Sequence, residues 1–110
     1  MHLAGRQMLL PAPIVAEVGY LLGTRAGVKA ESVFLRSLAA HDFVPVELIQ
    51  SDYSRMAELV ERYADLPLGT SDAAVIALAE RLDITDVATL DHRHFAVVRP
   101  RHTAGLTLLP

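Results

Sequence analysis

Apolar residues recur along the first half of the chain in short runs typical of strands and at three- to four-residue spacings typical of helices. Residues 7–10 predict a short strand. From Pro13 the pattern predicts a helix that stops at Gly27 and buries Ile14, Val15, Val18, Leu21 and Leu22. A second helix is predicted over residues 28–40, with an inward side formed by Val33, Phe34, Leu35 and Leu38.

The second half continues the alternation. Residues 43–46 predict a strand, and Ser51 is expected to cap a helix that runs to about Ala64 and buries Met56, Leu59, Val60 and Tyr63. Thr70 or Ser71 is expected to cap a fourth helix through Leu82, with Val75, Ile76 and Leu78 inside. Short strands are predicted at residues 87–90, 96–98 and 106–109. This order implies a single α/β domain over residues 1–110, with a mostly parallel sheet flanked by helices.

Composition excludes several kinds of site and a membrane-spanning helix. The chain of 110 residues has no cysteine, which excludes a disulfide scaffold, a thiolate zinc site and a cysteine nucleophile. No apolar run approaches the roughly 18 to 20 residues of a membrane helix, and residues 1–10 lack the pattern of a signal peptide. We therefore expect a cytoplasmic protein with no membrane partner.

Charge is distributed unevenly around a net value of −3. Residues 31–91 carry four arginines against twelve acids, whereas residues 92–110 carry Arg93, Arg99 and Arg101 and no acid. Such a chain does not coat DNA in general, because most of it is acidic. It is compatible with an acidic metal site beside a basic strip that contacts phosphates.

Three carboxylates occupy unusual positions. Glu17 lies in a helix predicted to be apolar on nearly every side, Asp72 begins the fourth helix, and Asp91 ends a predicted strand. Each also has an ordinary explanation: a solvent-facing stripe or a pair with Arg25 for Glu17, the helix dipole for Asp72, and a turn for Asp91. Ligands bind at the carboxyl ends of parallel strands, so the three acids are candidates for one site.

Oxygen ligands without cysteine favour hard ions such as Mg²⁺ or Mn²⁺, which assist attack on phosphodiesters. His92 and His94 are weak evidence for zinc, because a third imidazole is not apparent. The remaining acids considered are expected on the solvated surface: Glu31, Asp42, Glu47, Asp52, Glu58, Glu61 and Glu80.

Three segments in succession resemble motifs of PIN-domain ribonucleases, and most closely of the VapC toxins of toxin–antitoxin pairs. They span residues 11–18, 66–73 and 87–95, and the ending over residues 99–110 is similar to the C-terminal hairpin of that family. The resemblance implies a PIN-like three-layer sandwich. It also implies a quartet of acids that holds Mg²⁺ or Mn²⁺, in which Glu17, Asp72 and Asp91 match the second, third and fourth members. Ser71 matches a small hydroxyl residue that supports the site.

The beginning of the chain departs from the family pattern. Relatives open with a central strand that ends in an aspartate, whereas residues 1–10 contain no acid. The resemblance therefore implies a domain that is incomplete at its N-terminus, with a gap at the centre of its sheet. His94 also stands where many relatives carry a further aspartate.

Three functions remain open. The first is a metal-dependent endoribonuclease toxin, impaired by the missing first acid, in which Arg93, Arg99 and Arg101 contact RNA of the tRNA or rRNA class. The second is a catalytically inactive remnant that acts as an antitoxin-binding module. The third is a phosphohydrolase of small molecules. The family resemblance implies a VapB-like antitoxin as partner and a homodimer.

Overall fold

Five strands in the computed structural model form one sheet with the order β3-β2-β1-β4-β5. The structure describes all residues except 1, 5–6, 67, 85, 89–106 and 110. The strands are β1 (His2–Ala4), β2 (Gln7–Pro11), β3 (Phe43–Val46), β4 (Asp86–Ala88) and β5 (Thr107–Leu109). β2 runs parallel to β3 and β4 runs parallel to β5, whereas β1 is antiparallel to both of its neighbours.

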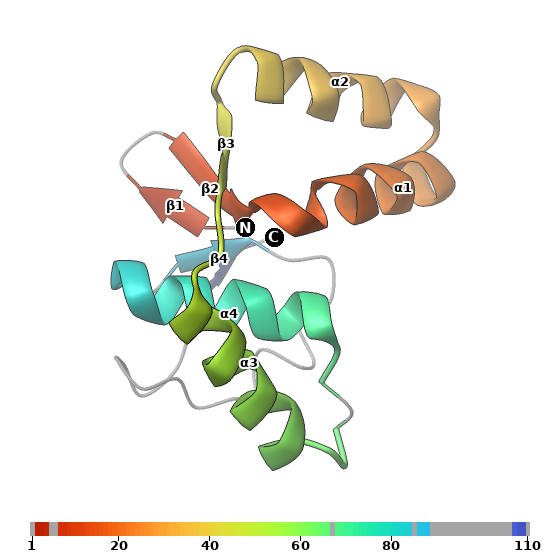
Figure 1. Ribbon diagram of the computed structural model, residues 1–110. Coiled ribbons are helices and arrows are strands. Elements are labelled where there is room, and N and C mark those ends of the chain that lie inside the picture. Colours follow the sequence, from red (N-terminus) through yellow and green to blue (C-terminus); the bar gives the residue numbers. More distant parts are fainter. Residues whose placement is uncertain (1, 5–6, 67, 85, 89–106, 110) are drawn as a thin grey trace.

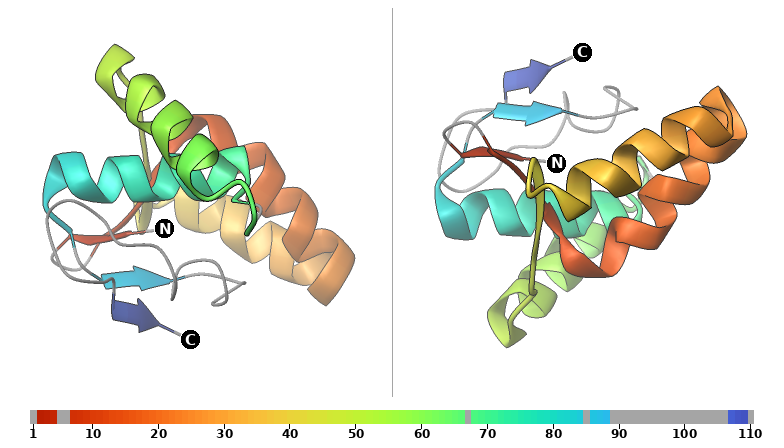
Figure 2. Two further views of the ribbon diagram at one scale, coloured as in Figure 1. Left: turned by 90° about the horizontal axis from the view of Figure 1, so that it is seen from below. Right: turned by 90° about the horizontal axis from the view of Figure 1, so that it is seen from above.

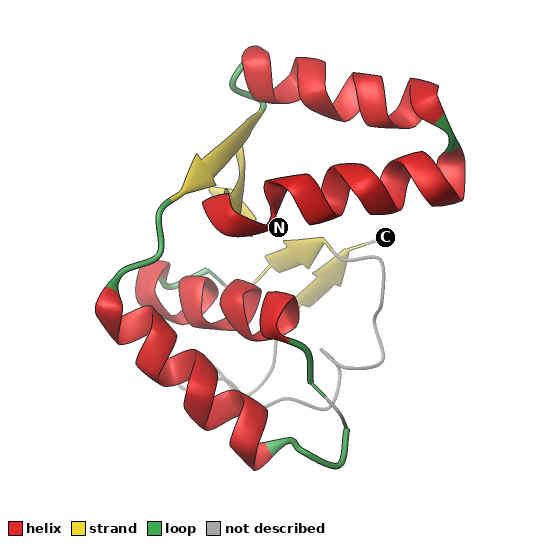
Figure 3. Ribbon diagram, turned by 45° about the vertical axis from the view of Figure 1, so that its right-hand side comes forward, coloured by secondary structure: helices red, strands yellow, loops and turns green. Residues whose placement is uncertain are grey.

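Four helices accompany these strands in the described part of the chain: α1 (Val15–Ala26), α2 (Val28–Ala39), α3 (Gln50–Arg62) and α4 (Thr70–Leu82). A turn of 3-10 helix, Ala12–Ile14, precedes α1. The α1–α2 pair lies on one side of the strands and the α3–α4 pair on the other (Figures 1 and 3). The two views of Figure 2 show that α4 lies between α3 and strands β4 and β5. The predicted α/β architecture is confirmed.

The centre of the sheet differs from the expectation. β1, which the hydrophobic pattern did not predict, pairs with β2 through three residues and with β4 through His2 and Val87. The expected gap is therefore not seen among the described strands, because the chain folds back from β1 to β2 and fills it. β1 and β4 are paired through one residue pair, so theirs is the shortest ladder in the described sheet.

Helix boundaries follow the predictions, but the predicted caps are wrong. Ser51 lies inside α3, which begins after Ile49. Thr70 and Ser71 are the first two residues of α4, and Gly69 occupies its cap position without a side-chain hydrogen bond. In place of Ser51, Asp52 accepts a hydrogen bond of 2.9 Å from the Ile49 amide and so satisfies a free donor at the start of α3. The strand predicted at residues 96–98 lies outside the described residues.

The hydrophobic core is centred on α4, which is buried along most of its length. Every residue from 73 to 79 is buried, and the core also includes Leu10, Ile14, Val18, Phe34, Met56, Leu59 and Leu68. Three residues that were predicted to be inward are exposed: Val33 (57%), Leu35 (50%) and Val60 (38%). Helical spacing indicates the apolar side of a helix, but burial covers only the part of that side that faces another element.

Two glycines shape the α1–α2 hairpin. Gly27 has a φ of 92°, which residues with a side chain rarely adopt, and it ends α1 as predicted. A Cβ atom on Gly23 would lie only 2.7 Å from Oε1 of Glu31, so Gly23 lets the Glu31 side chain of α2 approach α1 closely. Phe34 of α2 packs edge to face on Phe43 of β3, with ring centroids 5.3 Å apart.

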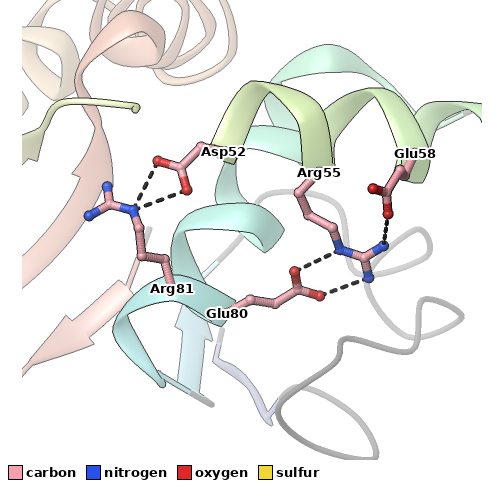
Figure 4. A network of polar contacts seen from close by, with 5 residues as sticks. All are labelled: Asp52, Arg55, Glu58, Glu80 and Arg81. Atoms are coloured by element: carbon pink, nitrogen blue, oxygen red, sulfur yellow. Dashed lines mark hydrogen bonds and ion pairs between the residues drawn. The ribbon is translucent and has the colours of Figure 1, made fainter. Parts of the chain in front are cut away.

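Ion pairs join α3 to α4 at two levels (Figure 4). Arg55 donates to both carboxylate oxygens of Glu80, from Nε at 2.8 Å and from Nη2 at 2.9 Å, and it also pairs with Glu58 at 3.3 Å. The pKa of Arg55 is raised above its already high ordinary value, because the effect of the hydrogen bond with Glu80 is larger than the opposing effect of burial. Arg55 is therefore a permanent cation at neutral pH, and Glu80 is its main partner.

The second level joins Arg81 to Asp52, whose side chain is only 3% exposed. Arg81 Nε donates to both carboxylate oxygens at 3.0 Å, and Arg81 Nη2 donates to the Glu47 carbonyl at 3.0 Å. The expectation that Asp52 and Glu80 lie on the solvated surface is wrong, since each is held between α3 and α4 by an arginine. These pairs fix the position of α4, the helix that begins with Thr70, Ser71 and Asp72.

The end of α4 offers a test of backbone strain. Asp83 adopts the left-handed conformation, with φ 55° and ψ 48°. Glycine reaches this region without a steric penalty, so we expect Asp83→Gly to raise the free energy of unfolding by about 0.5 kcal/mol. Asp83→Ala should lower it, because alanine has a Cβ atom and lacks the local hydrogen bonding of aspartate. Urea denaturation of both variants measures the signs, and equal effects would contradict this reading of Asp83.

Candidate functional site

The starts of α1 and α4 meet through one side-chain contact. The Ser71 hydroxyl, on the second residue of α4, donates a hydrogen bond to Oε2 of Glu17, on the third residue of α1. Ser71 is half-buried and Glu17 is exposed. Two of the predicted site residues, 54 positions apart in sequence, are therefore in direct contact.

Exposure of Glu17 corrects part of the sequence argument. The apolar neighbours of Glu17 suggested a carboxylate in surroundings without water, but the side chain faces solvent. Its position in the first turn of α1 also places it at the positive end of the helix dipole. Glu17 can therefore hold its negative charge without a buried partner.

Asp72 follows Ser71 in the first turn of α4 and is half-buried. A Cβ atom placed on Gly69 would lie 3.9 Å from Asp72 Oδ2, so this carboxylate lies beside the backbone at the helix start. The N-terminus of α4 stabilises negative charge there, by roughly 0.3 to 1 kcal/mol. The Ser71–Glu17 contact thus brings a second carboxylate to the helix start that already carries Asp72.

Several predicted site residues lie outside the described residues. They are Asp91, His92, Arg93, His94, Arg99 and Arg101. Within the described part of the chain, no group of three or more histidine, cysteine, aspartate or glutamate side chains is arranged to hold a metal ion. Glu17 and Asp72 offer carboxylate oxygens only, which is the donor type that hard divalent cations prefer, so these two residues fit such an ion as part of a larger ligand set.

Sequence reasoning missed the residues that hold α4 in place. Two ion pairs, Arg55–Glu80 and Arg81–Asp52, join α4 to α3. A signal was available in the sequence. Along α3 an acid, Asp52, comes before a base, Arg55, and along α4 read in reverse a base, Arg81, comes before an acid, Glu80, so two antiparallel helices bring opposite charges together.

None of the helices that the structure describes has the length and apolar character needed to cross a bilayer.

Comparison with known proteins gives two concordant matches. The profile of the PIN domain family matches residues 2–99 of the chain. Ribonuclease VapC26 of Mycobacterium tuberculosis (strain ATCC 25618 / H37Rv) is 37% identical over 97 residues, which cover 88% of this chain and 72% of that protein. The PIN-domain match spans the positions of Glu17, Ser71, Asp72 and Asp91.

Proposed function

Because the chain belongs to the PIN-domain family, we propose that it is a metal-dependent endoribonuclease of the VapC type, which hydrolyses phosphodiester bonds in RNA. The observation that carries this proposal is the contact between Glu17 and Ser71 at the helix start that bears Asp72. It joins two of the segments that resemble PIN motifs. Similarity to a protein named as a ribonuclease supports RNA as the substrate.

We further propose that the cofactor is Mg²⁺ or Mn²⁺ and that Glu17, Asp72 and Asp91 would hold it. When bound, such an ion lowers the pKa of a water molecule and stabilises negative charge on the attacked phosphate. Ser71 orients the Glu17 carboxylate through its hydroxyl hydrogen. Asp72 is fixed by the backbone of α4, which the ion pairs with α3 hold in place.

The partners follow from the same assignment. Arg93, Arg99 and Arg101 are proposed to contact the phosphates of an RNA of the tRNA or rRNA class. A VapB-like antitoxin is proposed to inhibit the enzyme, and a homodimer is its proposed assembly. The proposed location of the enzyme is the cytoplasm, where it would meet these RNA substrates.

A second candidate is a catalytically inactive module that binds the antitoxin. It is favoured by the absence of any acid from residues 1–16, which include the central strand β1. Incubation of the purified chain with tRNA and rRNA fragments, with Mg²⁺ or Mn²⁺ and with excess chelator, separates the two. Metal-dependent cleavage supports the enzyme, whereas intact RNA together with antitoxin binding supports the module.

Ser71 provides a finer test of the site. Residues that orient a metal ligand typically contribute tenfold to a hundredfold to metal affinity or activity. We expect Ser71→Ala to slow RNA cleavage about tenfold, because Glu17 loses its hydrogen-bond donor. Thr70→Ala is the matched control, since Thr70 is the exposed neighbour at the same helix start. Equal rates for the two variants would contradict the role proposed for Ser71.

A further inference from the structure

Tyr20 is an exposed aromatic residue on the helix that carries Glu17. Its side chain is 67% exposed, and no aromatic side chain in the described part of the chain is more exposed. Exposure alone does not make it a binding residue, because single apolar side chains are common on protein surfaces. Its place beside the candidate site is what gives Tyr20 a role to consider.

Helix geometry directs the Tyr20 ring toward Glu17. Tyr20 follows Glu17 by three positions on α1, so their Cβ atoms are neighbours on the helix surface, roughly 5 to 6 Å apart. Aromatic side chains on a helix point back toward its N-terminus, over the residues three and four positions earlier. For Tyr20 these are Glu17 and Ala16, both exposed. The ring therefore lies on the side of α1 that leads to the Ser71–Glu17 contact.

The other described aromatic rings are engaged elsewhere or lie far along the chain from the site. Phe34 packs on Phe43, and the Arg62 guanidinium lies 5.7 Å from the ring centre of Tyr63. Tyr53 is 52% exposed, but it belongs to α3, on the opposite side of the strands from α1 (Figures 1 and 3). Tyr20 is thus the aromatic residue available beside Glu17, and Tyr53 is a matched control for it.

The neighbours of Tyr20 favour a planar ligand over a protein partner. The residues one turn before and after it on α1 are small or polar: Ala16, Glu17, Gly23 and Thr24. A protein partner is recognised by a contiguous apolar patch, which one ring among such residues does not supply. A nucleic-acid base needs only one ring, because stacking uses the flat face that every base has.

We propose that Tyr20 binds RNA by stacking on the base of a nucleotide that flanks the scissile phosphate. The inference rests on the proposed nuclease function, since it is the phosphate at Glu17 and Asp72 that brings RNA to this part of α1. A base is attached to its phosphate through one sugar, and the single helical turn between Glu17 and Tyr20 is of comparable length. The stacked base has to be unpaired, because a base within a duplex has both faces covered.

A tryptophan probe tests the contact without cleavage, since the chain has no tryptophan of its own. Tyr20→Trp is made in the Asp72→Asn chain, so that RNA stays intact, and is titrated with single-stranded oligoadenylate in Mg²⁺. We expect saturable loss of the tryptophan fluorescence, because stacking on a base quenches an indole. Tyr53→Trp in the same background should keep its fluorescence.

Cleavage kinetics test whether the contact serves the reaction. Tyr20→Ala should raise KM for RNA about tenfold with little change in kcat, because a stacked base contributes equally to the bound substrate and to the transition state. Tyr20→Phe keeps the ring and should match the wild type, as should Tyr53→Ala. On an RNA that lacks the stacked base, the wild-type chain and Tyr20→Ala should have the same KM. Calorimetric titration should give Tyr20→Ala the Mn²⁺ affinity of the wild type, which a damaged metal site would not.

The outcomes separate this inference from the nuclease assignment. A wild-type chain that cleaves RNA, with equal KM values for Tyr20→Ala and Tyr53→Ala, overturns the role of Tyr20 and leaves the enzyme in place. Unchanged fluorescence of Tyr20→Trp also overturns it. Weaker antitoxin binding by Tyr20→Ala with an unaltered KM assigns the ring to a protein and likewise overturns it. Quenching of Tyr20→Trp in a chain whose wild type cleaves no RNA supports the stacking contact and contradicts the nuclease.

Discussion

Replacement of Asp72 by asparagine should reduce the rate of metal-dependent RNA cleavage about a hundredfold while the protein remains folded. The change keeps the size of the side chain but removes one negative charge from the start of α4. A bound divalent ion contributes several kcal/mol to transition-state stabilisation, and about 2.7 kcal/mol corresponds to a hundredfold in rate. Asparagine is a poorer ligand for a hard cation, because it offers a neutral oxygen in place of a carboxylate.

Stability should change little in the same variant, because two effects oppose each other. Loss of the charge removes a favourable interaction with the helix dipole of roughly 0.3 to 1 kcal/mol, but it also removes repulsion from the Glu17 carboxylate. Calorimetric titration measures the Mn²⁺ affinity, and thermal melting without metal measures the stability. Asp65→Asn, in the exposed turn after α3, is the matched control. Equal Mn²⁺ affinity in the two variants would remove Asp72 from the proposed site.

Replacement of Glu80 by alanine should lower the free energy of unfolding by about 3 kcal/mol, because it leaves Arg55 charged and poorly paired. The two side chains are only 9% and 11% exposed, so water cannot fully replace the lost carboxylate. Glu58 retains its contact with Arg55, but its side chain is 53% exposed and it screens the charge less effectively. The loss should not depend on pH around neutrality, since Arg55 stays protonated there.

The matched control for this ion pair is Glu58→Ala, which removes the exposed partner of the same arginine. Exposed pairs contribute roughly 0 to 1 kcal/mol, so the control should unfold almost like the wild type. Replacing both members, as in Arg55→Met with Glu80→Leu, should recover most of the stability that Glu80→Ala loses. Urea denaturation measures all three proteins. A Glu58→Ala variant as unstable as Glu80→Ala would contradict the assignment of Glu80 as the main partner.

The predicted helices and strands were close to those observed because local patterns carry that information. Gly27 ends α1, as expected for a residue that adopts positive φ without strain, and residues 43–46 form β3 with the predicted bounds. β1 could not be predicted in the same way. Its three residues become a strand only because β2 and β4 offer hydrogen bonds on both sides.

The candidate site shows the same division between local and tertiary information. Asp72 was predicted as a site residue from its position at a helix start and from family resemblance, and Ser71 from family resemblance alone; in the structure Ser71 contacts Glu17. The surroundings of each acid could not be read locally. Glu17 has apolar neighbours in sequence but faces solvent, whereas Asp52 has polar neighbours but is buried against Arg81. Exposure depends on which elements pack nearby, and periodicity within one helix does not specify that.

Cleavage of a circular RNA by the purified chain tests the central claim most directly. A circle has no ends, so only an endonuclease converts it to a linear product, and sequencing of that product locates the cut. We expect linear RNA in the presence of Mg²⁺ or Mn²⁺, none with excess chelator, and much less with Asp72→Asn. Circles that stay intact with either metal and a folded wild-type chain would contradict the assignment of this protein as a metal-dependent endoribonuclease.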